Sequence, residues 1–224
     1  MHAARARKRG PKTDAVMDAL QQGIDAAARG DCDAAIRALT EAIEANPRLP
    51  LAYRHRGHTY VRKGQWDRAI ADLTKAISLD PTAANPFATR GYALYRIGDY
   101  SRAISDCTEA IRIDPSLAAA YTYRAASCLR LGDWERAVAD YTQALNLGIG
   151  LPSASHTHRG YALWRAGDVH RAMCDFTEAI RLDPNNGEAF YYRGVVYQDT
   201  GETRKAEEDF SQAKCLGYKP TQEP

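Results

Sequence analysis

Residues 52–81, AYRHRGHTYVRKGQWDRAIADLTKAISLDP, decide the fold because their pattern returns almost at once. Residues 87–115 read FATRGYALYRIGDYSRAISDCTEAIRIDP, with the same Arg-Gly, a similar run of aromatic residues and the same Asp-Pro ending. Aligning the chain on the small residue of this pattern gives six units at intervals of 34 or 35 residues. The aligned residues are Gly23, Gly57, Gly91, Ala125, Gly160 and Gly194. The sequence is therefore an array of internal repeats.

Each unit carries the start and stop signals of two helices. A glycine stands near its middle, where a residue without Cβ takes the left-handed turn that ends a helix. Between these marks apolar residues recur at intervals of three and four, as in Ile70, Leu73 and Ile77. No segment alternates with the period of two that is typical of a strand. The middle glycines are Gly30, Gly64, Gly98, Gly132, Gly167 and Gly201.

On these residues the chain resembles the tetratricopeptide repeat (TPR) family from about residue 16 to residue 218. The resemblance implies an all-α fold, a right-handed α-solenoid of six antiparallel helix pairs that forms a single domain over residues 15–218. We expect residues 1–14 to be a disordered basic N-terminal arm and residues 219–224 a short C-terminal tail. The expected repeats are 16–49, 50–83, 84–117, 118–152, 153–186 and 187–218.

An arginine precedes the small residue in five units, and an aspartate follows that arginine by sixteen residues in the same five. The first unit, with Gln22 and Ala38 at these positions, lacks both. We therefore predict a buried or half-buried ion pair within each unit, in which each charge offsets the desolvation of the other. The predicted pairs are Arg56–Asp72, Arg90–Asp106, Arg124–Asp140, Arg159–Asp175 and Arg193–Asp209.

Two positions of the second helices change character in the last unit. The first five units have apolar residues there, whereas the sixth has Glu207 and Lys214. A terminal repeat has no neighbour to bury these positions, so we expect no seventh helix pair and no large C-terminal domain.

The joint between the fourth and fifth units, residues 146–156 (NLGIGLPSASH), replaces the Asp-Pro turn and adds one residue. Gly148, Gly150 and Pro152 favour either a flexible junction or a longer loop of no consequence. The sequence leaves both interpretations open.

The composition is that of an ordinary soluble protein, with 45% hydrophobic residues, 26% charged residues and a net charge of +2 over 224 residues. No stretch approaches the roughly 18 apolar residues of a membrane span, and no apolar segment follows the basic start as in a secretion signal. The five cysteines form no CxxC pair, so we interpret them as reduced core thiols. We therefore expect a cytoplasmic monomer.

The sequence contains no motif for catalysis or for a bound cofactor. A glycine-rich phosphate loop, a Gly-x-Ser-x-Gly elbow and a His-Glu-x-x-His helix are all missing. His55 and His58 share a helical face, but no acid or cysteine completes a ligand set, and solvated or packing histidines are the commoner case. We therefore expect no catalytic residue, no cofactor and no metal.

The resemblance implies that the first helices line a concave groove that receives an extended peptide or a helix. Arginines occupy one position in four successive first helices, with aromatic residues between them. Arginine and aromatic side chains are frequent anchors of interfaces, so we predict a non-enzymatic scaffold that binds an acidic or aromatic peptide. The predicted groove residues are Arg54, His58, Arg62, Tyr92, Tyr95, Arg96, Tyr123, Arg130, His158, Tyr161, Trp164, Arg165 and Tyr192.

Two alternatives stay open. An arginine just before the turn glycine is also favoured by the negative end of the helix, whether or not it binds a ligand. Residues 5–12 carry five bases and are able to hold a nucleic acid or an anionic surface, with the solenoid as a spacer, although a short basic terminus is more often only a solubilising tail.

One partner known for the family is not expected. In members of the family that this chain resembles, a clamp of lysines and asparagines holds the C-terminal tails of chaperones. The corresponding positions of this chain hold Arg54, His58, Thr89, Ala119 and Tyr123. We therefore do not expect chaperone tails to bind.

Overall fold

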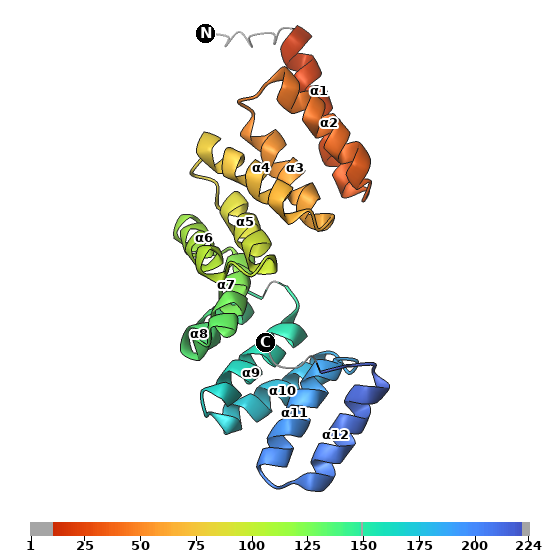
Figure 1. The fold of residues 1–224 in the computed structure, drawn as a ribbon, viewed down its shortest axis with the longest axis vertical. Coiled ribbons are helices and arrows are strands. Elements are labelled where there is room, and N and C mark those ends of the chain that lie inside the picture. The colour runs from red at the N-terminus through yellow and green to blue at the C-terminus, as the bar shows by residue number, and fades with distance from the viewer. Residues whose placement is uncertain (1–10, 149, 221–224) are drawn as a thin grey trace, which may run out of the picture. The chain divides into compact units, whose positions relative to one another are not determined.

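The computed structural model describes residues 11–148 and 150–220, and in this part of the chain all regular structure is helical (Figure 1). Twelve α-helices follow one another there, in agreement with the predicted all-α fold. Their bounds are α1 Pro11–Ala28, α2 Cys32–Ala45, α3 Pro50–Arg62, α4 Trp66–Leu79, α5 Ala84–Arg96, α6 Tyr100–Ile113, α7 Ala118–Leu131, α8 Trp134–Asn146, α9 Pro152–Arg165, α10 Val169–Leu182, α11 Gly187–Asp199 and α12 Thr203–Cys215.

The helices form two compact units, Met1–Ile97 with α1 to α5 and Gly98–Pro224 with α6 to α12. The division falls within the third predicted repeat. Inside each unit a helix packs against the helices next to it along the chain and, more weakly, against the next but one. This is the contact pattern of a solenoid, in which each repeat touches only its neighbours.

Helix α1 reaches into the segment predicted to be a disordered arm, since the described part of the chain is helical from Pro11 onward. The predicted boundary after residue 14 is therefore wrong, because residues 11–14 are helical. Residues 1–10 of the arm and residues 221–224 of the tail lie outside the described residues.

The turn between the two helices of each pair is the one that the sequence predicts. The middle glycine of every pair has a positive φ, between 68° at Gly64 and 90° at Gly167. Aspartates then cap four of the second helices, each accepting a hydrogen bond from a backbone N–H three residues later. Those aspartates are Asp31, Asp99, Asp133 and Asp168.

Small residues allow the helices of a pair to approach closely. A Cβ added to Gly160 would lie 2.9 Å from Cε1 of Phe176, a side chain with no exposed surface. Six alanines of the second helices, one in each pair, are at most 2% exposed, as expected for close packing. They are Ala35, Ala69, Ala103, Ala137, Ala172 and Ala206.

Four of the five predicted ion pairs are present, each between a buried aspartate and a half-buried arginine. In each, Nε of the arginine lies 2.7 Å from one carboxylate oxygen and Nη2 binds the other, so the contact is bidentate. The aspartates are between 5% and 7% exposed. The pairs are Arg56–Asp72, Arg124–Asp140, Arg159–Asp175 and Arg193–Asp209. Arg90 and Asp106 belong to different units, and their bridge stays a prediction.

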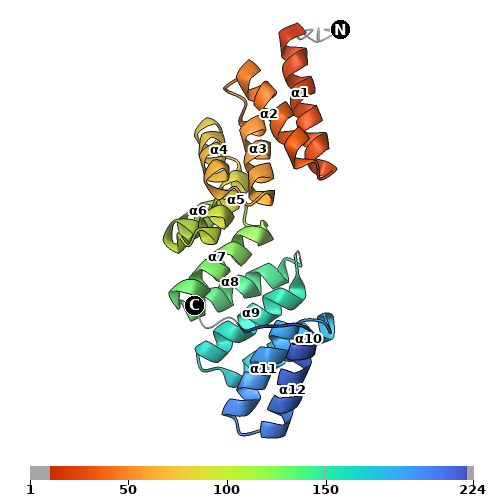
Figure 2. The same ribbon diagram turned by 45° about the vertical axis from the view of Figure 1, so that its right-hand side comes forward.

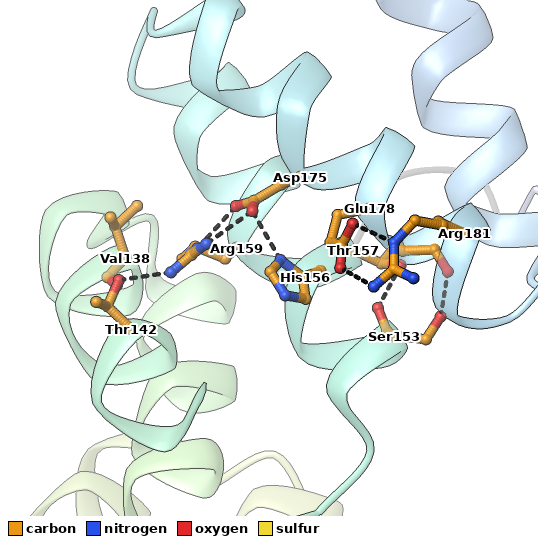
Figure 3. Close-up of polar contacts among 10 residues, drawn as sticks. Val138, Thr142, Ser153, His156, Thr157, Arg159, Asp175, Glu178 and Arg181 are labelled. Carbon is orange, nitrogen blue, oxygen red and sulfur yellow. Dashed lines mark hydrogen bonds and ion pairs between the residues drawn. The ribbon is translucent and has the colours of Figure 1, made fainter. Parts of the chain in front are cut away.

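Each of these arginines also binds the preceding repeat. Figure 3 shows Nη1 of Arg159 on α9 donating to Oγ1 of Thr142 on α8 at 3.1 Å, while that hydroxyl donates to the carbonyl of Val138 at 2.7 Å. In this repeat His156 adds a contact of 2.8 Å from Nδ1 to Asp175. The same arginine–threonine bond recurs in Arg56–Thr40, Arg90–Thr74, Arg124–Thr108 and Arg193–Thr177.

The interpretation of the cysteines as core thiols is right for only two of them. Cys107 and Cys128 are buried, and burial raises the pKa of Cys107 to about 12 and that of Cys128 to about 11. Cys174 and Cys215 are exposed on the second helices α10 and α12, because they stand at positions that face away from the paired helix.

Within the described ranges, no helix combines the length and the apolar content that a membrane span needs.

Candidate functional site

The first helices of the pairs form one face of each unit. In the second unit α9 contacts both α7 and α11, and in the first unit α3 contacts both α1 and α5. Among the described residues no such contact joins the second helices α8, α10 and α12 to one another. Because, in the described part of the chain, first helices contact one another and second helices do not, the first helices lie on the inner side of a bend within each unit. The predicted groove requires this arrangement.

A cluster of three side chains, Trp134, Tyr161 and Arg165, marks this face in the second unit. The guanidinium carbon of Arg165 lies 4.7 Å from the centre of the Trp134 ring and 5.8 Å from that of Tyr161. Nη1 of Arg165 donates to the Tyr161 hydroxyl at 2.9 Å, and the two rings meet edge to face at 6.0 Å. The arginine is exposed at the surface, yet its charged group is fixed by two rings and a hydrogen bond.

The first unit contains the same cluster, built from Trp66, Tyr92 and Arg96. The guanidinium carbon of Arg96 lies 4.5 Å from the Trp66 ring, its Nη1 donates to the Tyr92 hydroxyl at 2.8 Å, and the rings again meet edge to face at 6.0 Å. Sequence reasoning predicted the tyrosines and arginines but missed the tryptophans, which open the second helix of the preceding repeat. The available signal was the recurrence of tryptophan 30 or 31 residues before each of these arginines.

Arg62 occupies the same repeat position but has a different role. The repeat before Arg62 has Cys32 at the position that Trp66 and Trp134 occupy in the two clusters, so it offers no tryptophan ring to the guanidinium. Instead Nη1 of Arg62 donates to the carbonyl of Ala27, one of the last carbonyls of α1. For this residue the structure favours the alternative in which the arginine serves a helix C-terminus, although that helix belongs to the preceding repeat rather than to its own.

Two predicted groove residues, Trp164 and Tyr192, take part in packing. Both are half-buried against the apolar cluster that contains Leu163 and Phe176. The Tyr192 ring lies 4.9 Å from Tyr161 and 6.1 Å from Phe176, and burial raises the pKa of Tyr192. These side chains contribute to the face mainly by holding Tyr161 in place.

The other predicted residues lie on first helices of both units. Nη2 of Arg54 lies 3.1 Å from Nε2 of His55, and the pKa of His58 is lowered by partial burial and by nearby arginines. His158 on α9 packs 5.7 Å from the Tyr141 ring, with Nε2 3.7 Å from a carboxylate oxygen of Glu188. Tyr95 and Tyr123 are half-buried on α5 and α7, whereas Arg130 is exposed at the end of α7.

The arrangement suits recognition of side chains and carboxylates. A fixed guanidinium pairs with a carboxylate through two parallel hydrogen bonds, and the adjoining rings offer surfaces for stacking. No three His, Cys, Asp or Glu side chains of the described residues are grouped so as to hold a metal ion.

Comparison with known proteins gives one family. Models described as TPR repeat or tetratricopeptide repeat match residues 57–98, 85–117, 116–183 and 176–208, which together span residues 57–208 without a gap. No match was found among curated proteins.

Solved structures with similar folds include three that cover most of this chain. YrrB, described as a TPR protein with an unusual peptide-binding site, is 23% identical with a TM-score of 0.68 over 80% of this chain and 92% of its own. MamA from Desulfovibrio magneticus RS-1 is 18% identical with a TM-score of 0.69 over 75% and 94%. A chain of the APC/C hetero-tetramer Cut9–Hcn1 is 16% identical with a TM-score of 0.76 over 93% and 40%. At these identities the likeness is one of fold.

Proposed function

Because the chain belongs to the tetratricopeptide repeat family, we propose that it is a non-catalytic scaffold that binds a segment of a partner protein along its first helices. Repeat solenoids present extended surfaces of this kind, and the preformed face lowers the cost of ordering this side of a complex. The description of YrrB as a peptide-binding TPR protein supports the proposal by analogy of fold.

The observation that carries the proposal is the recurrence of one cluster, a tryptophan, a tyrosine and an arginine, in both units. Arg96 and Arg165 are exposed, but each is held in place by an aromatic ring below 5 Å and by a tyrosine hydroxyl. A fixed cation loses little side-chain entropy when it binds, so such a residue is a favourable anchor.

The ligand that fits this chemistry is a peptide with acidic and aromatic residues. Carboxylates pair with the guanidinium groups, and aromatic side chains stack on the tyrosine and tryptophan rings beside them. The proposed anchors are Tyr92, Arg96, Tyr123, Arg130, Tyr161 and Arg165.

The experiment is an affinity capture from the lysate of the source cell, followed by direct binding of the captured protein. The intact chain is compared with a variant in which Arg96, Arg130 and Arg165 are changed to Glu. A matched control carries the same charge change at three exposed bases of second helices, Arg37, Lys75 and Lys214. Both variants are first shown to be folded by circular dichroism.

We expect the intact chain and the control to hold a protein that the first-helix variant loses. Retention of the same protein by all three chains would refute the groove. If nuclease treatment or deletion of residues 1–12 releases the captured material, binding instead belongs to the basic arm, and a steep loss with salt would accompany it.

A further inference from the structure

The C-terminal segment turns back over the last first helix. Helix α12 ends at Cys215, and two residues later Gly217 has a φ of 76°. Gly217 donates its N–H to the carbonyl of Lys214, and Tyr218 donates its N–H to the carbonyl of Ala213, both at 3.0 Å. This pair of bonds is the Schellman arrangement, which reverses the direction of the chain at a helix end. Figures 1 and 2 show the dark blue segment after α12 crossing the end of α11.

Tyr218 docks on the first two turns of α11. Its ring lies 5.3 Å from that of Tyr191 and meets it in a tilted arrangement. Burial and the nearby carboxylate of Glu188 raise the pKa of Tyr218. The ring is therefore held on the same helix whose Tyr192 is a predicted groove residue.

The surface under Tyr218 is shaped for it. A Cβ at Gly187 would lie 2.9 Å from Cβ of Tyr218 and 3.3 Å from that of Leu216, so the glycine permits the close approach. The corresponding residues of earlier repeats, such as Ala118 and Ser153, all carry a Cβ. Only the repeat that receives the C-terminal segment has a glycine there.

The surface continues beyond Tyr218. Gly187 and Glu188 also line an open pocket of about 470 Å³, together with Asp183 and the exposed apolar residues Leu151 and Leu182. In the C-terminal segment Tyr218 is followed by the base Lys219. This order suits a surface on which the ring of Tyr191 lies near the two acidic residues of the pocket, Asp183 and Glu188.

We propose that this face of α11 is a docking site for a tyrosine-containing segment, which Tyr218 of the same chain fills as an intramolecular ligand. The proposal rests on the scaffold function above, because a partner peptide that uses this end of the first-helix face must displace Tyr218. A segment tethered by the two residues that follow Cys215 has an effective concentration in the millimolar range, so a weak contact suffices to keep the site filled.

The test uses a fluorescent peptide with the sequence of residues 216–224, LGYKPTQEP, and the same peptide with alanine in place of tyrosine. Anisotropy measures the binding of each peptide to the full chain, to its Tyr218→Ala variant and to a Tyr197→Ala control. Tyr197 is another half-buried tyrosine of α11, and its ring contacts Arg193 and Lys205 rather than the C-terminal segment.

We expect the tyrosine peptide to bind the Tyr218→Ala chain about tenfold or more tightly than the intact chain and the Tyr197→Ala control, and the alanine peptide to lose this binding. Equal affinity for all three chains, or no binding to any, would overturn the proposal.

Hydrogen exchange of the full-length chains gives a second readout that needs no peptide. Residues 187–192 should exchange faster in the Tyr218→Ala chain than in the intact one, while α7 and α8 stay unchanged; unchanged exchange at residues 187–192 would also overturn the proposal. Because the peptide assay does not involve Arg96, Arg130 or Arg165, its failure and a failure of the scaffold function are distinguishable.

Discussion

At the scale of single residues, Asp140 shows how much a repeated ion pair constrains the chain. Its carboxylate is 6% exposed and is held by Arg124 on the facing helix. A buried charge that loses its partner is costly, whereas an apolar pair of similar volume removes both the charges and their desolvation.

We therefore expect Arg124→Ala to lower the free energy of unfolding by about 3–5 kcal/mol. The double change Arg124→Met with Asp140→Leu should lower it by clearly less. Urea denaturation of the single and double variants measures the difference, and equal losses would show that the two charges are not coupled.

His55 makes stability depend on pH. Burial, Arg54 and His58 lower its pKa from an ordinary value near 6.5 to about 4. Between pH 6.5 and pH 4 the unfolded chain therefore binds a proton at His55 that the folded chain does not. The stability that the neutral ring contributes is complete above pH 6.5 and is lost as the pH falls from 6.5 through 4. The contact of Arg54 with Nε2 agrees with a neutral ring, since the arginine donates and the nitrogen must accept.

The expected result is a midpoint of thermal unfolding that falls between pH 7 and pH 5 in the intact chain and falls less in His55→Gln. Parallel pH dependence of the two chains would show that His55 is not the titrating group. The comparison stays above pH 5, because the carboxylates titrate at lower pH.

Single residues also show what the sequence could and could not predict. The four observed Arg–Asp pairs were predictable because the arginine and the aspartate occur together in five units and are both missing from the first. The threonine that binds each of these arginines recurs at nearly the same interval before it, yet threonine is common on helices and gave no separate signal. The role of Arg62 was not predictable from its repeat position, because it depends on whether the preceding repeat supplies an aromatic ring.

At the scale of elements, helix capping differs between otherwise similar repeats. Asp133 at the start of α8 accepts from the N–H of Arg136, whereas Gln65 at the start of α4 makes no side-chain capping bond. An aspartate at this place satisfies a backbone donor and faces the positive end of the helix dipole.

Changing Gln65→Asp should thus raise the free energy of unfolding by about 0.5–1 kcal/mol. The converse change Asp133→Gln should lower it by a similar amount. Chemical denaturation of both variants tests the pair, and changes of the same sign would contradict capping as their cause.

Elements were predictable where one local rule fixes them. The helices and their turn glycines follow from spacing and from the need for positive φ. The first boundary was misplaced, since a basic stretch indicates an unstructured arm whereas residues 11–14 are helical. Trp66 and Trp134 were missed as site residues because their partners lie on the next repeat.

At the scale of the whole molecule, stability should be a sum of local terms. In the part of the chain that the structure describes, the helices of each unit contact only near neighbours, so the loss of one contact does not unfold distant helices at once. Among the described residues α1 and α2 contact, besides each other, only helix α3. Gly148 and Gly150 interrupt the helices between α8 and α9.

Hydrogen exchange should accordingly be fastest, within the helical array, at α1 and α2 and at residues 146–151. The middle of α10 should be among the slowest segments, because α9 and α11 both pack against it. The measurement is mass spectrometry of exchanged peptides at low denaturant. Exchange that is fastest in α10 would show that stability is not distributed in this nearest-neighbour way.

In the observed Arg–Asp pairs the arginine binds an aspartate of its own repeat and a threonine of the preceding one. This double contact affects how such a chain can change its length. Each copied unit of 34 residues brings a donor for the unit before it and an acceptor for the unit after it. A tandem gene duplication therefore creates a matched junction without any further mutation, and an in-frame deletion of one unit restores it between new neighbours. This bond gives the array a way to grow or shorten by recombination while keeping the same arginine–threonine contact between neighbouring repeats.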